Sequence, residues 1–587
     1  MRMPRIAIVR KERCNPVACG HYLCARLCPV NKEGRDCIKP DPITKKANID
    51  EGLCVGCGIC PNKCPFEAIY IANLPNELTT KPIHQYGHNG FHLYNLPQPV
   101  FGKVVGILGR NGIGKSTAIK IFAGVLKPNL GTDKEKSYAE LLEYFKGSAS
   151  QRFFEDIRDG RIKVSYKPQQ VDQLAKVAKG KVRELLQKAD ERKAFDEVVE
   201  ALDLTNVLDA DVHTLSGGEL QRVAIAGTLL KDANLYLIDE PTSFLDIKQR
   251  LRVARYIREF PNERRAVMVI EHDLIILDAM CDLVHIVFGK EGCYGIVSQP
   301  KAARTGMNSY LEGWLRDENM RFRDHAIEFM VRPPQKKARI IQLTSWKGIT
   351  TKLGHFTLNA TQGALNNSEV IGVLGENGIG KTTFAKILAH VLTPDQGSRD
   401  EQLKVSYKPQ YLDGESDELV MAALGPNAKK HEATLLKPLD MHHLMLKPLN
   451  TLSGGELQRV AIVKTLVAEA DLYLLDEPSA FLDVEQRLIV SKAIREFADQ
   501  TNKTVLVVDH DLMFLDYLAD RLLVFEGEPG KHGTATGPFI LEEGMNHFLT
   551  GIDVTFRRDQ ESHRPRVNKP GSVADREQKE EGKLYYS

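Results

Sequence analysis

The sequence predicts an α/β protein in which two copies of one domain follow a small cysteine-rich domain. Nine of the 11 cysteines lie within the first 64 residues. Two motifs then occur twice: a glycine-rich loop with a lysine, at 109–117 and 375–383, and the run TLSGGELQRVAI, at 214–225 and 451–462. Because 587 residues are too many for one hydrophobic core, several domains are expected.

The bulk composition is that of an ordinary soluble protein. Hydrophobic residues make up 42% and charged residues 27% of the chain, and the net charge of +2 gives no global positive field that would indicate nucleic acid. The chain holds no apolar run of membrane-spanning length, and its first residues lack the apolar core of a secretion signal. We therefore expect a cytoplasmic protein without a membrane partner.

The cysteine spacing predicts two [4Fe–4S] clusters. One run has the x₂, x₂ and x₃ spacing, followed by proline, that bacterial ferredoxins use, and an earlier run is a stretched version with the same ending. In two-cluster ferredoxins the fourth cysteine of each run ligates the other cluster. The expected ligand sets are Cys54, Cys57, Cys60 and Cys28 for one cluster, and Cys14, Cys19, Cys24 and Cys64 for the other.

Zinc is the alternative occupant, because eight thiolates could bind two tetrahedral ions. The three cysteines at x₂ intervals before a Cys-Pro ending favour iron–sulfur clusters. A disulfide framework is not expected in a large chain without a secretion signal. Cys37, Cys281 and Cys293 are left over and are expected to be buried free thiols.

Each glycine-rich loop lies between a strand-like and a helix-like segment, which is the context of a P-loop NTPase. Backbone N–H groups of such a loop bind phosphates at a helix N-terminus. Lys115 and Lys381 are expected to reach the β- and γ-phosphates, and Ser116 and Thr382 to bind Mg²⁺. The other ATP-binding residues expected in the loops are Gly109, Asn111, Gly112, Gly114, Thr117, Gly375, Asn377, Gly378, Gly380 and Thr383.

Two apolar strands, 235–239 and 472–476, each end in adjacent carboxylates. Asp239 and Asp476 are suited to Mg²⁺, whereas Glu240 and Glu477 are suited to polarising the attacking water. A histidine follows each pair at nearly the same distance. We therefore expect His272 and His510 to be catalytic residues that sense the γ-phosphate.

Aromatic residues ahead of each loop are candidates for stacking on adenine. Tyr86 is predicted for the first copy and Trp346 for the second. Phe91 and Phe356 are the alternatives.

Together these motifs resemble the ATP-binding-cassette (ABC) ATPases. The resemblance implies that the LSGGE signature of each cassette closes over the ATP of the other, so that two ATP molecules join the cassettes. It also implies that Gln169 and Gln410 sense Mg²⁺, and that Asp246 and Asp483 belong to the loop after DEP. The signature residues are Ser216, Gly217, Gly218 and Glu219, opposite Lys381, and Ser453, Gly454, Gly455 and Glu456, opposite Lys115.

The whole architecture resembles the class E ABC proteins, known as the RNase L inhibitor family. This resemblance implies ATP-driven splitting of ribosomes after termination, with the small ribosomal subunit and a release-factor-like protein as partners. It also implies a monomer whose two cassettes pair within the chain. The expected parts are a ferredoxin-like α+β domain (1–80), a first cassette (81–298) with a helical insertion at about 132–163, a hinge (299–340), a second cassette (341–540), and a second hinge with the tail (541–587).

Two other functions remain open from the sequence. The chain could be a redox protein in which ATP hydrolysis gates electron flow through the clusters, or the energising ATPase subunit of a transporter. Electron transfer requires a cluster that changes oxidation state during turnover. A mechanical role requires only a rigid domain, which iron–sulfur bonds can provide where the core is small.

Overall fold

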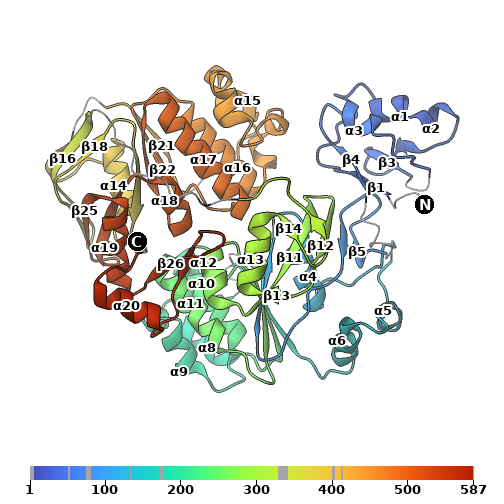
Figure 1. Cartoon of the computed structure of the whole chain (residues 1–587), viewed down its shortest axis with the longest axis horizontal. Coiled ribbons are helices and arrows are strands. Elements are labelled where there is room, and N and C mark those ends of the chain that lie inside the picture. Colours follow the sequence, from blue (N-terminus) through green and yellow to red (C-terminus); the bar gives the residue numbers. More distant parts are fainter. Residues whose placement is uncertain are drawn as a thin grey trace. The chain divides into compact units, whose positions relative to one another are not determined.

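The computed structural model describes residues 5–50, 53–73, 81–132, 134–171, 176, 178–327, 329, 341–399, 403–410 and 414–585 (Figure 1). Its internal contacts divide the chain into two compact units. Unit 1 comprises Met1–Pro241, Ile257–His272 and Cys281–His325, and unit 2 comprises Thr242–Tyr256, Asp273–Met280 and Ala326–Ser587. Within the described part of the chain, no helix has the length and apolar character needed to cross a membrane.

The cysteine-rich domain, in unit 1, is built from short elements around buried sulfur. Strand β1 (Arg5–Val9) pairs antiparallel with β4 (Ile69–Asn73), and β2 (Ile38–Pro40) pairs with β3 (Ala47–Ile49). The helices are α1 (Leu23–Leu27), α2 (Pro29–Lys32) and α3 (Ile59–Lys63). Buried cysteines share one core with Ile38, Ile49 and Ile69. The thiols therefore fill positions that aliphatic side chains would occupy in a larger domain.

The other part of unit 1 is a sheet flanked by helices. Among the described residues its strands follow the order β5-β6-β12-β11-β7-β10-β9-β8, with β13 paired to β11. The bounds are β5 (His84–Gln85), β6 (His92–Tyr94), β7 (Val104–Leu108), β8 (Val164–Lys167), β9 (Leu235–Asp239), β10 (Ala266–Ile270), β11 (Leu283–Lys290), β12 (Tyr294–Val297) and β13 (Lys301–Ala302). Strands β11, β7, β10, β9 and β8 run parallel, so their carboxyl ends meet at one edge, where ligands of such sheets bind.

The helices of the first copy follow several of these strands, and another begins within the signature motif; residues 242–256 and 273–280 of this copy are grouped with unit 2. These helices are α4 (Lys115–Phe122), α8 (Val182–Ala189), α9 (Phe195–Ala201), α10 (Gly217–Leu229), α11 (Ile247–Glu259), α12 (Leu274–Met280) and α13 (Ala303–Glu312). Strands β14 (Trp314–Leu315) and β15 (Met320–Arg321) form a hairpin after α13. The predicted first hinge, 299–340, lies partly outside the described residues.

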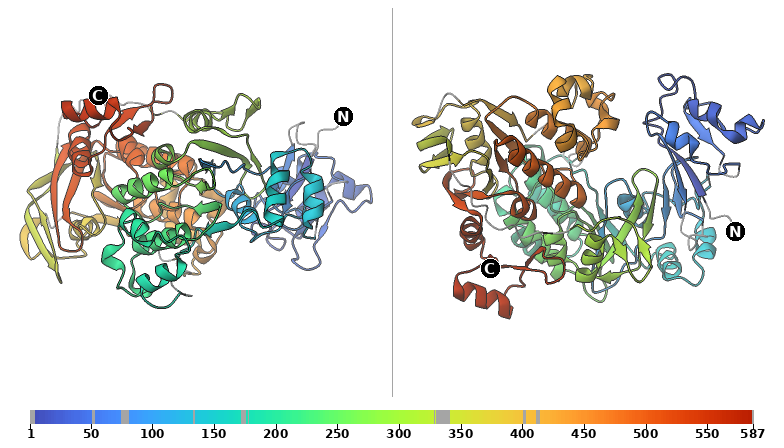
Figure 2. Two further views of the ribbon diagram at one scale, coloured as in Figure 1. Left: turned by 90° about the horizontal axis from the view of Figure 1, so that it is seen from below. Right: turned by 45° about the horizontal axis from the view of Figure 1, so that its top comes forward.

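The insertion of the first copy forms two helices, α5 (Tyr138–Tyr144) and α6 (Ala149–Arg158), which pack against each other (Figure 2). The chain turns between them at Gly147, whose φ of 80° is left-handed and suits glycine. Phe153 of α6 packs edge-to-face on Phe122 of α4 with ring centroids 4.7 Å apart. Aromatic packing therefore fixes the insertion to the helix that follows the first phosphate loop.

Unit 2 repeats the same sheet plan. In its described residues the order is β18-β16-β17-β25-β24-β19-β23-β22-β21, with β20 paired to β16. The strands are β16 (Gln342–Leu353), β17 (Phe356–Ala360), β18 (Gly363–Asn366), β19 (Val370–Leu374), β20 (Gln396–Arg399), β21 (Val405–Lys408), β22 (Leu472–Asp476), β23 (Thr504–Val508), β24 (Arg521–Glu528) and β25 (His532–Ile540). The helices are α14 (Lys381–Leu388), α15 (Val420–Leu424), α16 (Gly454–Leu466), α17 (Val484–Thr501), α18 (Leu512–Leu518) and α19 (Leu541–Ile552).

The C-terminal segment of unit 2 contacts α12 and α18, the two helices that follow the predicted catalytic histidines. It contains β26 (Phe556–Arg558), β27 (Pro565–Val567) and α20 (Val573–Glu581). Asp278 of α12 accepts a 2.6 Å hydrogen bond from Arg566 of β27. Asp516 of α18 accepts one from Tyr585 near the chain end. Equivalent carboxylates on two equivalent helices are thus bound by one segment of chain.

Candidate nucleotide sites and cluster ligands

The two glycine-rich loops have the same local geometry. Gly114 precedes α4 with φ 92° and Gly380 precedes α14 with φ 95°, a left-handed conformation that glycine adopts without strain. A Cβ at Gly114 would lie 2.7 Å from the ring of Phe91, and one at Gly380 would lie 3.0 Å from that of Phe356. Each loop therefore leads directly into the N-terminus of a helix, where phosphate binds well.

Both loop lysines are buried and bonded to their own loops. The ammonium of Lys115 donates to the carbonyls of Gly109 (2.8 Å) and Arg110 (2.6 Å). Lys381 donates to Gly375 (2.8 Å) and Glu376 (2.6 Å). Burial lowers the pKa of Lys381 to about 8, although nearby carboxylates, Asp246 first among them, favour its ammonium form.

ATP binding at the second site is expected to take up a proton above pH 8. The free protein loses the Lys381 proton as pH rises through about 8, whereas bound phosphates favour the ammonium. Affinity should therefore fall by up to about tenfold per pH unit above that value. Calorimetry at pH 8.5 in two buffers of different ionisation heat measures the uptake, using Lys115→Ala to leave only the second site. With Lys381→Arg added the uptake should vanish; equal uptake would assign the proton elsewhere.

The residues predicted for Mg²⁺ come together at both sites. Thr382 donates a 2.8 Å hydrogen bond to Oδ2 of Asp476, and Ser116 hydrogen-bonds Asp239. Among the described residues, Oδ1 of Asp239 and Oδ1 of Asp476 are buried and accept no hydrogen bond. Burial raises the pKa of Asp239 to about 6. A buried carboxylate oxygen without a donor fits a hard cation, so these residues suit Mg²⁺.

The glutamates after the buried strands are held in an uncommon backbone conformation. Glu240 and Glu477 both have φ 48°, which is left-handed and costly for a residue with a side chain. Gln169 donates to Oε1 of Glu240 at 2.7 Å, and Gln410 donates to Oε1 of Glu477 at the same distance. Each predicted glutamine is thus brought to its glutamate.

The histidines complete each site but face different electrostatic surroundings. Nε2 of His272 lies 3.5 Å from Oε1 of Glu240, and Nε2 of His510 lies 3.6 Å from Oε1 of Glu477. Burial alone favours neutral Glu240, but the hydrogen bond and charge of His272 outweigh it and lower the pKa to about 2. At the second site burial and the charge of Asp509 raise the pKa of Glu477, and burial places that of His510 well below its ordinary value.

The signature motifs begin two long helices. Ser216 caps α10 and Ser453 caps α16, and each serine forms a reciprocal capping box with the glutamate three residues later. The carboxylates of Glu219 and Glu456 therefore bind their own helix caps. Each signature serine and the two glycines after it lie at a helix N-terminus, where the helix dipole attracts anions.

Asp246 and Asp483 have contacts in unit 2. Oδ2 of Asp246 accepts a 3.0 Å hydrogen bond from the backbone N–H of Asn377, in the second phosphate loop. The side chain of Asn377 donates to the carbonyl of Phe244 at 3.2 Å. Asp483 caps α17 by accepting from Gln486 N–H at 2.9 Å. Asp246 thus contacts a loop that follows it by more than a hundred residues.

The aromatic prediction for the second site is wrong. Trp346 is 1% exposed, donates to the carbonyl of Thr361 at 2.6 Å and packs against Phe384 in the core, so its faces cannot take a base. Phe356 lies against Gly380 as Phe91 lies against Gly114. The shared pattern Phe-x-Leu ahead of each loop was the signal available for this pair.

Tyr86 remains a candidate, because the residue is 45% exposed and its hydroxyl lies 3.3 Å from Thr117 Oγ1. Replacing it by alanine is expected to weaken ATP binding at the first site by roughly tenfold, since stacking on a base contributes about 1–3 kcal/mol. Titration of a fluorescent ATP analogue into a Lys381→Ala background measures this. Tyr86→Phe keeps the ring and should keep the affinity; unchanged affinity in the alanine variant would remove Tyr86 from the site.

The predicted cluster ligands lie close to one another in the cysteine-rich domain. A cavity in the cysteine-rich domain is lined by Cys14, Cys19, Cys24 and Cys64, so the last cysteine of the second run joins the first run. Cys60 interacts electrostatically with Cys54, Cys57 and Cys28, and also with Cys24. Burial raises the pKa of Cys24 to about 11 and that of Cys60 to about 12. These cysteine side chains supply the sulfur ligands that iron–sulfur clusters require.

The leftover cysteines are all buried: Cys37 is 1% exposed, Cys281 2% and Cys293 0%. Cys37 lies beside Cys28. Among the described residues no group of three or more His, Cys, Asp or Glu side chains is placed to hold a single metal ion.

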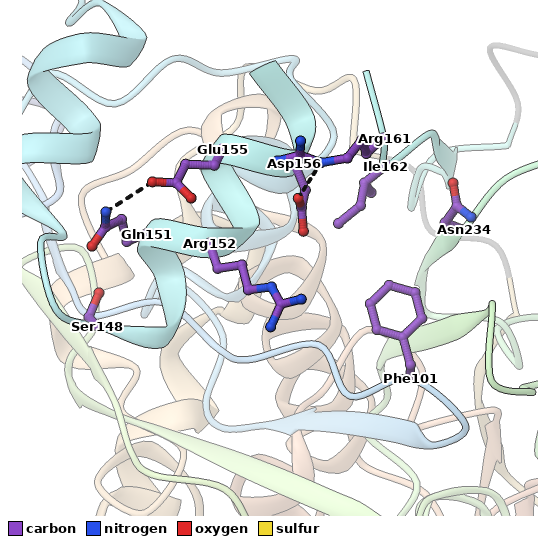
Figure 3. A pocket seen from close by; sticks show the side chains of 9 residues that line it. All are labelled: Phe101, Ser148, Gln151, Arg152, Glu155, Asp156, Arg161, Ile162 and Asn234. Atoms are coloured by element: carbon purple, nitrogen blue, oxygen red, sulfur yellow. Dashed lines mark hydrogen bonds and ion pairs between the residues drawn. The ribbon is translucent and has the colours of Figure 1, made fainter. Parts of the chain in front are cut away.

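A separate cavity of about 640 Å³ lies beside the insertion helix α6 (Figure 3). Its lining residues are Phe101, Ser148, Gln151, Arg152, Glu155, Asp156, Arg161, Ile162 and Asn234. None of the predicted nucleotide, signature or cluster residues lines it, so it is distinct from the sites described above.

Comparison with known proteins agrees with this arrangement. The "ABC transporter" family model matches residues 100–243 and 358–480, "Possible Fer4-like domain in RNase L inhibitor, RLI" matches 4–36, and "4Fe-4S binding domain" matches 47–70. The chain is 43% identical to the ABC transporter E family member 1 of Arabidopsis thaliana, over 100% of this chain and 99% of the relative. The chain belongs to the RNase L inhibitor family. It is 43% identical to translation initiation factor RLI1 of Saccharomyces cerevisiae, over 99% of this chain and 98% of the relative.

Solved structures of the RNase L inhibitor family share the fold. A structure described as "Model of ribosome-bound archaeal Pelota and ABCE1" matches with a TM-score of 0.94 and 51% identity, over 99% of both chains. One described as "RNase-L Inhibitor" matches with a TM-score of 0.82 and 50% identity, over 86% of this chain and 99% of that chain. The predicted fold, an α/β tandem of ABC cassettes after a ferredoxin-like domain, is confirmed.

The family also establishes the chemistry. The protein is an ABC-type ATPase that uses ATP and Mg²⁺ and carries two [4Fe–4S] clusters. The zinc alternative is therefore set aside. When bound, Mg²⁺ supplies charge neutralisation for the phosphates, and the clusters cross-link a domain with a small core.

Proposed function

We propose that this protein is an ATP-driven ribosome recycling factor. ATP binding closes the two cassettes and moves the cluster domain, which splits the ribosome into subunits after termination, and hydrolysis resets the protein. The small ribosomal subunit and a release-factor-like protein are its partners, and the protein works in the cytoplasm as a monomer. The observation that carries this proposal is the full-length match to a ribosome-bound relative in complex with Pelota.

The site geometry supports the residue roles that we propose. Lys115 and Lys381 bind the phosphates, and Glu240 and Glu477 polarise the attacking water, each oriented by its glutamine and histidine. The signature serines bind the γ-phosphate of the opposite site. The cysteine sets are those predicted from spacing. The domain bounds proposed are 1–80, 81–298 with the insertion, 299–340, 341–540 and 541–587.

Within unit 1, a series of contacts connects the first phosphate loop to the cluster domain. Arg10 donates to the carbonyl of Glu291, and the ammonium of Lys290 lies 3.5 Å from the ring centre of Tyr70. In the same turn, Gly292 donates to the carbonyl of Gly112 at 2.9 Å. One turn therefore contacts both the cluster domain and the phosphate loop, which supports a domain moved by nucleotide.

Sucrose-gradient sedimentation tests the proposal. Ribosomes are incubated with the protein, a release factor, and ATP or its non-hydrolysable analogue. Subunits should accumulate only when the protein and nucleotide are both present. Ribosomes that stay intact under all conditions would overturn it, and a change in the cluster spectra during ATP turnover would favour the redox alternative.

A further inference from the structure

Two buried lysines at the nucleotide sites have no role in the mechanism described above. Lys167 is the last residue of β8 and Lys408 the last of β21, and each is 1% exposed. Burial lowers the pKa of both to about 8. An ammonium removed from water is costly, so a lysine is retained at such a place only where its donors are needed.

The donors of these lysines bind the main chain that carries the catalytic acids. Lys167 donates to the carbonyl of Asp239 at 2.8 Å and to that of Glu240 at 3.2 Å. Lys408 donates to the carbonyl of Asp476 at 2.8 Å and to that of Pro409 at 3.1 Å. Each lysine therefore links the strand that precedes Gln169 or Gln410 to the main chain of the catalytic acids.

A glutamine approaches the same turn from the signature helix. Gln221 of α10 donates to the carbonyl of Glu240 at 2.6 Å, and Gln458 of α16 donates to that of Glu477 at 2.7 Å. These glutamines are 0% and 1% exposed. Both copies thus place a buried amide on the carbonyl of the catalytic glutamate.

The glutamate backbone requires such support. Its left-handed φ of 48° persists only where surrounding contacts determine it. The N–H of Glu240 donates to Ile270 O at 2.9 Å, and that of Glu477 donates to Val508 O at 2.7 Å. With its N–H bonded to a neighbouring strand and its carbonyl bonded to the glutamine, the peptide around each glutamate has one orientation.

We propose that Lys167, Gln221, Lys408 and Gln458, here called the anchor residues, are positioning residues that hold the catalytic glutamates in the left-handed conformation. This conformation directs the carboxylate of Glu240 at Gln169 and that of Glu477 at Gln410, and both carboxylates at the attacking water. The inference rests on the catalytic role proposed for Glu240 and Glu477. Because Gln221 and Gln458 lie on the signature helices, each glutamate is also connected to the helix whose serine serves the other ATP.

The test compares two double variants, Lys167→Met with Lys408→Met, and Gln221→Leu with Gln458→Leu. Both are expected to lower kcat for ATP by roughly tenfold to hundredfold, because small misplacements of a catalytic group have effects of that size. KM for ATP should stay within about threefold, since the phosphate loops are unchanged. Lys301→Met is the matched control, because Lys301 is another buried lysine but its ammonium contacts Asp317. Its kcat should match the wild type.

A double-mutant cycle distinguishes positioning from a merely structural role. In a background with Glu240→Gln and Glu477→Gln, the anchor substitutions should cause no further loss in single-turnover hydrolysis, because they act through the missing carboxylates. A loss of equal size in both backgrounds, or a wild-type kcat in a folded anchor variant, would overturn the inference. If the lysine variants do not fold, the glutamine variants decide. Wild-type hydrolysis in the glutamate variants themselves would instead overturn the proposed catalytic role.

Discussion

Replacing Glu240 and Glu477 by glutamine together is expected to lower ATP hydrolysis by roughly 10²- to 10⁴-fold, the usual contribution of a general base. Glutamine keeps the size and the hydrogen-bonding capacity of the side chain but cannot accept the proton of water. ATP binding should persist, because the loop lysines and the Mg²⁺ residues are unchanged. A coupled phosphate-release assay measures the hydrolysis, and filter binding of labelled ATP measures the retained nucleotide.

The same variant should remain on the small ribosomal subunit when ATP is present. Since hydrolysis resets the protein, blocking it holds the closed state. Sedimentation with small subunits detects this state. Glu312→Gln serves as a control, because Glu312 lies at the end of α13 and forms an exposed ion pair with Arg316. A glutamate variant that sediments free of ribosomes with ATP would contradict the recycling mechanism.

Replacing Cys54 by serine is expected to abolish ribosome splitting while ATP binding stays intact. Serine is a poor ligand for iron, so the cluster on Cys54, Cys57, Cys60 and Cys28 should be lost, and the iron content should fall from about eight to about four or fewer atoms per chain. The domain then lacks a cross-link within a small core to which several cysteines contribute. Iron analysis, visible absorption and the splitting assay measure the three effects.

Cys281→Ser is the matched control, because Cys281 is also buried but lies outside the cluster domain. It should keep its iron and its splitting activity. Cys37→Ser tests whether Cys37 is a cluster ligand. Cys37 lies beside Cys28 but is not in either predicted ligand set, so about eight iron atoms per chain should remain. Splitting that survives in a Cys54 variant without its cluster would remove the cluster domain from the mechanism.

Features encoded by contiguous residues could be predicted from the sequence. A phosphate loop is one strand, one turn and one helix, so its glycines and lysine specify its geometry locally. The position of Cys64 beside Cys14, Cys19 and Cys24 could likewise be predicted, because the cysteine spacing matches that of two-cluster ferredoxins. The capping boxes of Ser216 and Ser453 are also local, since their partners lie three residues away.

Features that depend on distant segments could not be predicted from the sequence. Trp346 and Phe356 are both aromatic and both precede the second loop, and nothing in their spacing says which is buried. In the structure Trp346 of β16 faces Gly363 of β18, where a Cβ would lie 2.3 Å from its ring, so the indole fills the space that this glycine leaves. Only the pairing of those strands places the indole in the core and leaves Phe356 beside Gly380.

The sequence by itself determined the cofactors and the tandem of cassettes and supplied the predictions for the residues at each site, because these are carried by short motifs with strict spacing. The tertiary structure decided how those residues are held. The left-handed glutamates, the buried lysines behind them and the contact between Asp246 and Asn377 all join segments far apart in the chain. Their energies depend on burial and on the direction of main-chain groups, and both arise only when strands and helices pack.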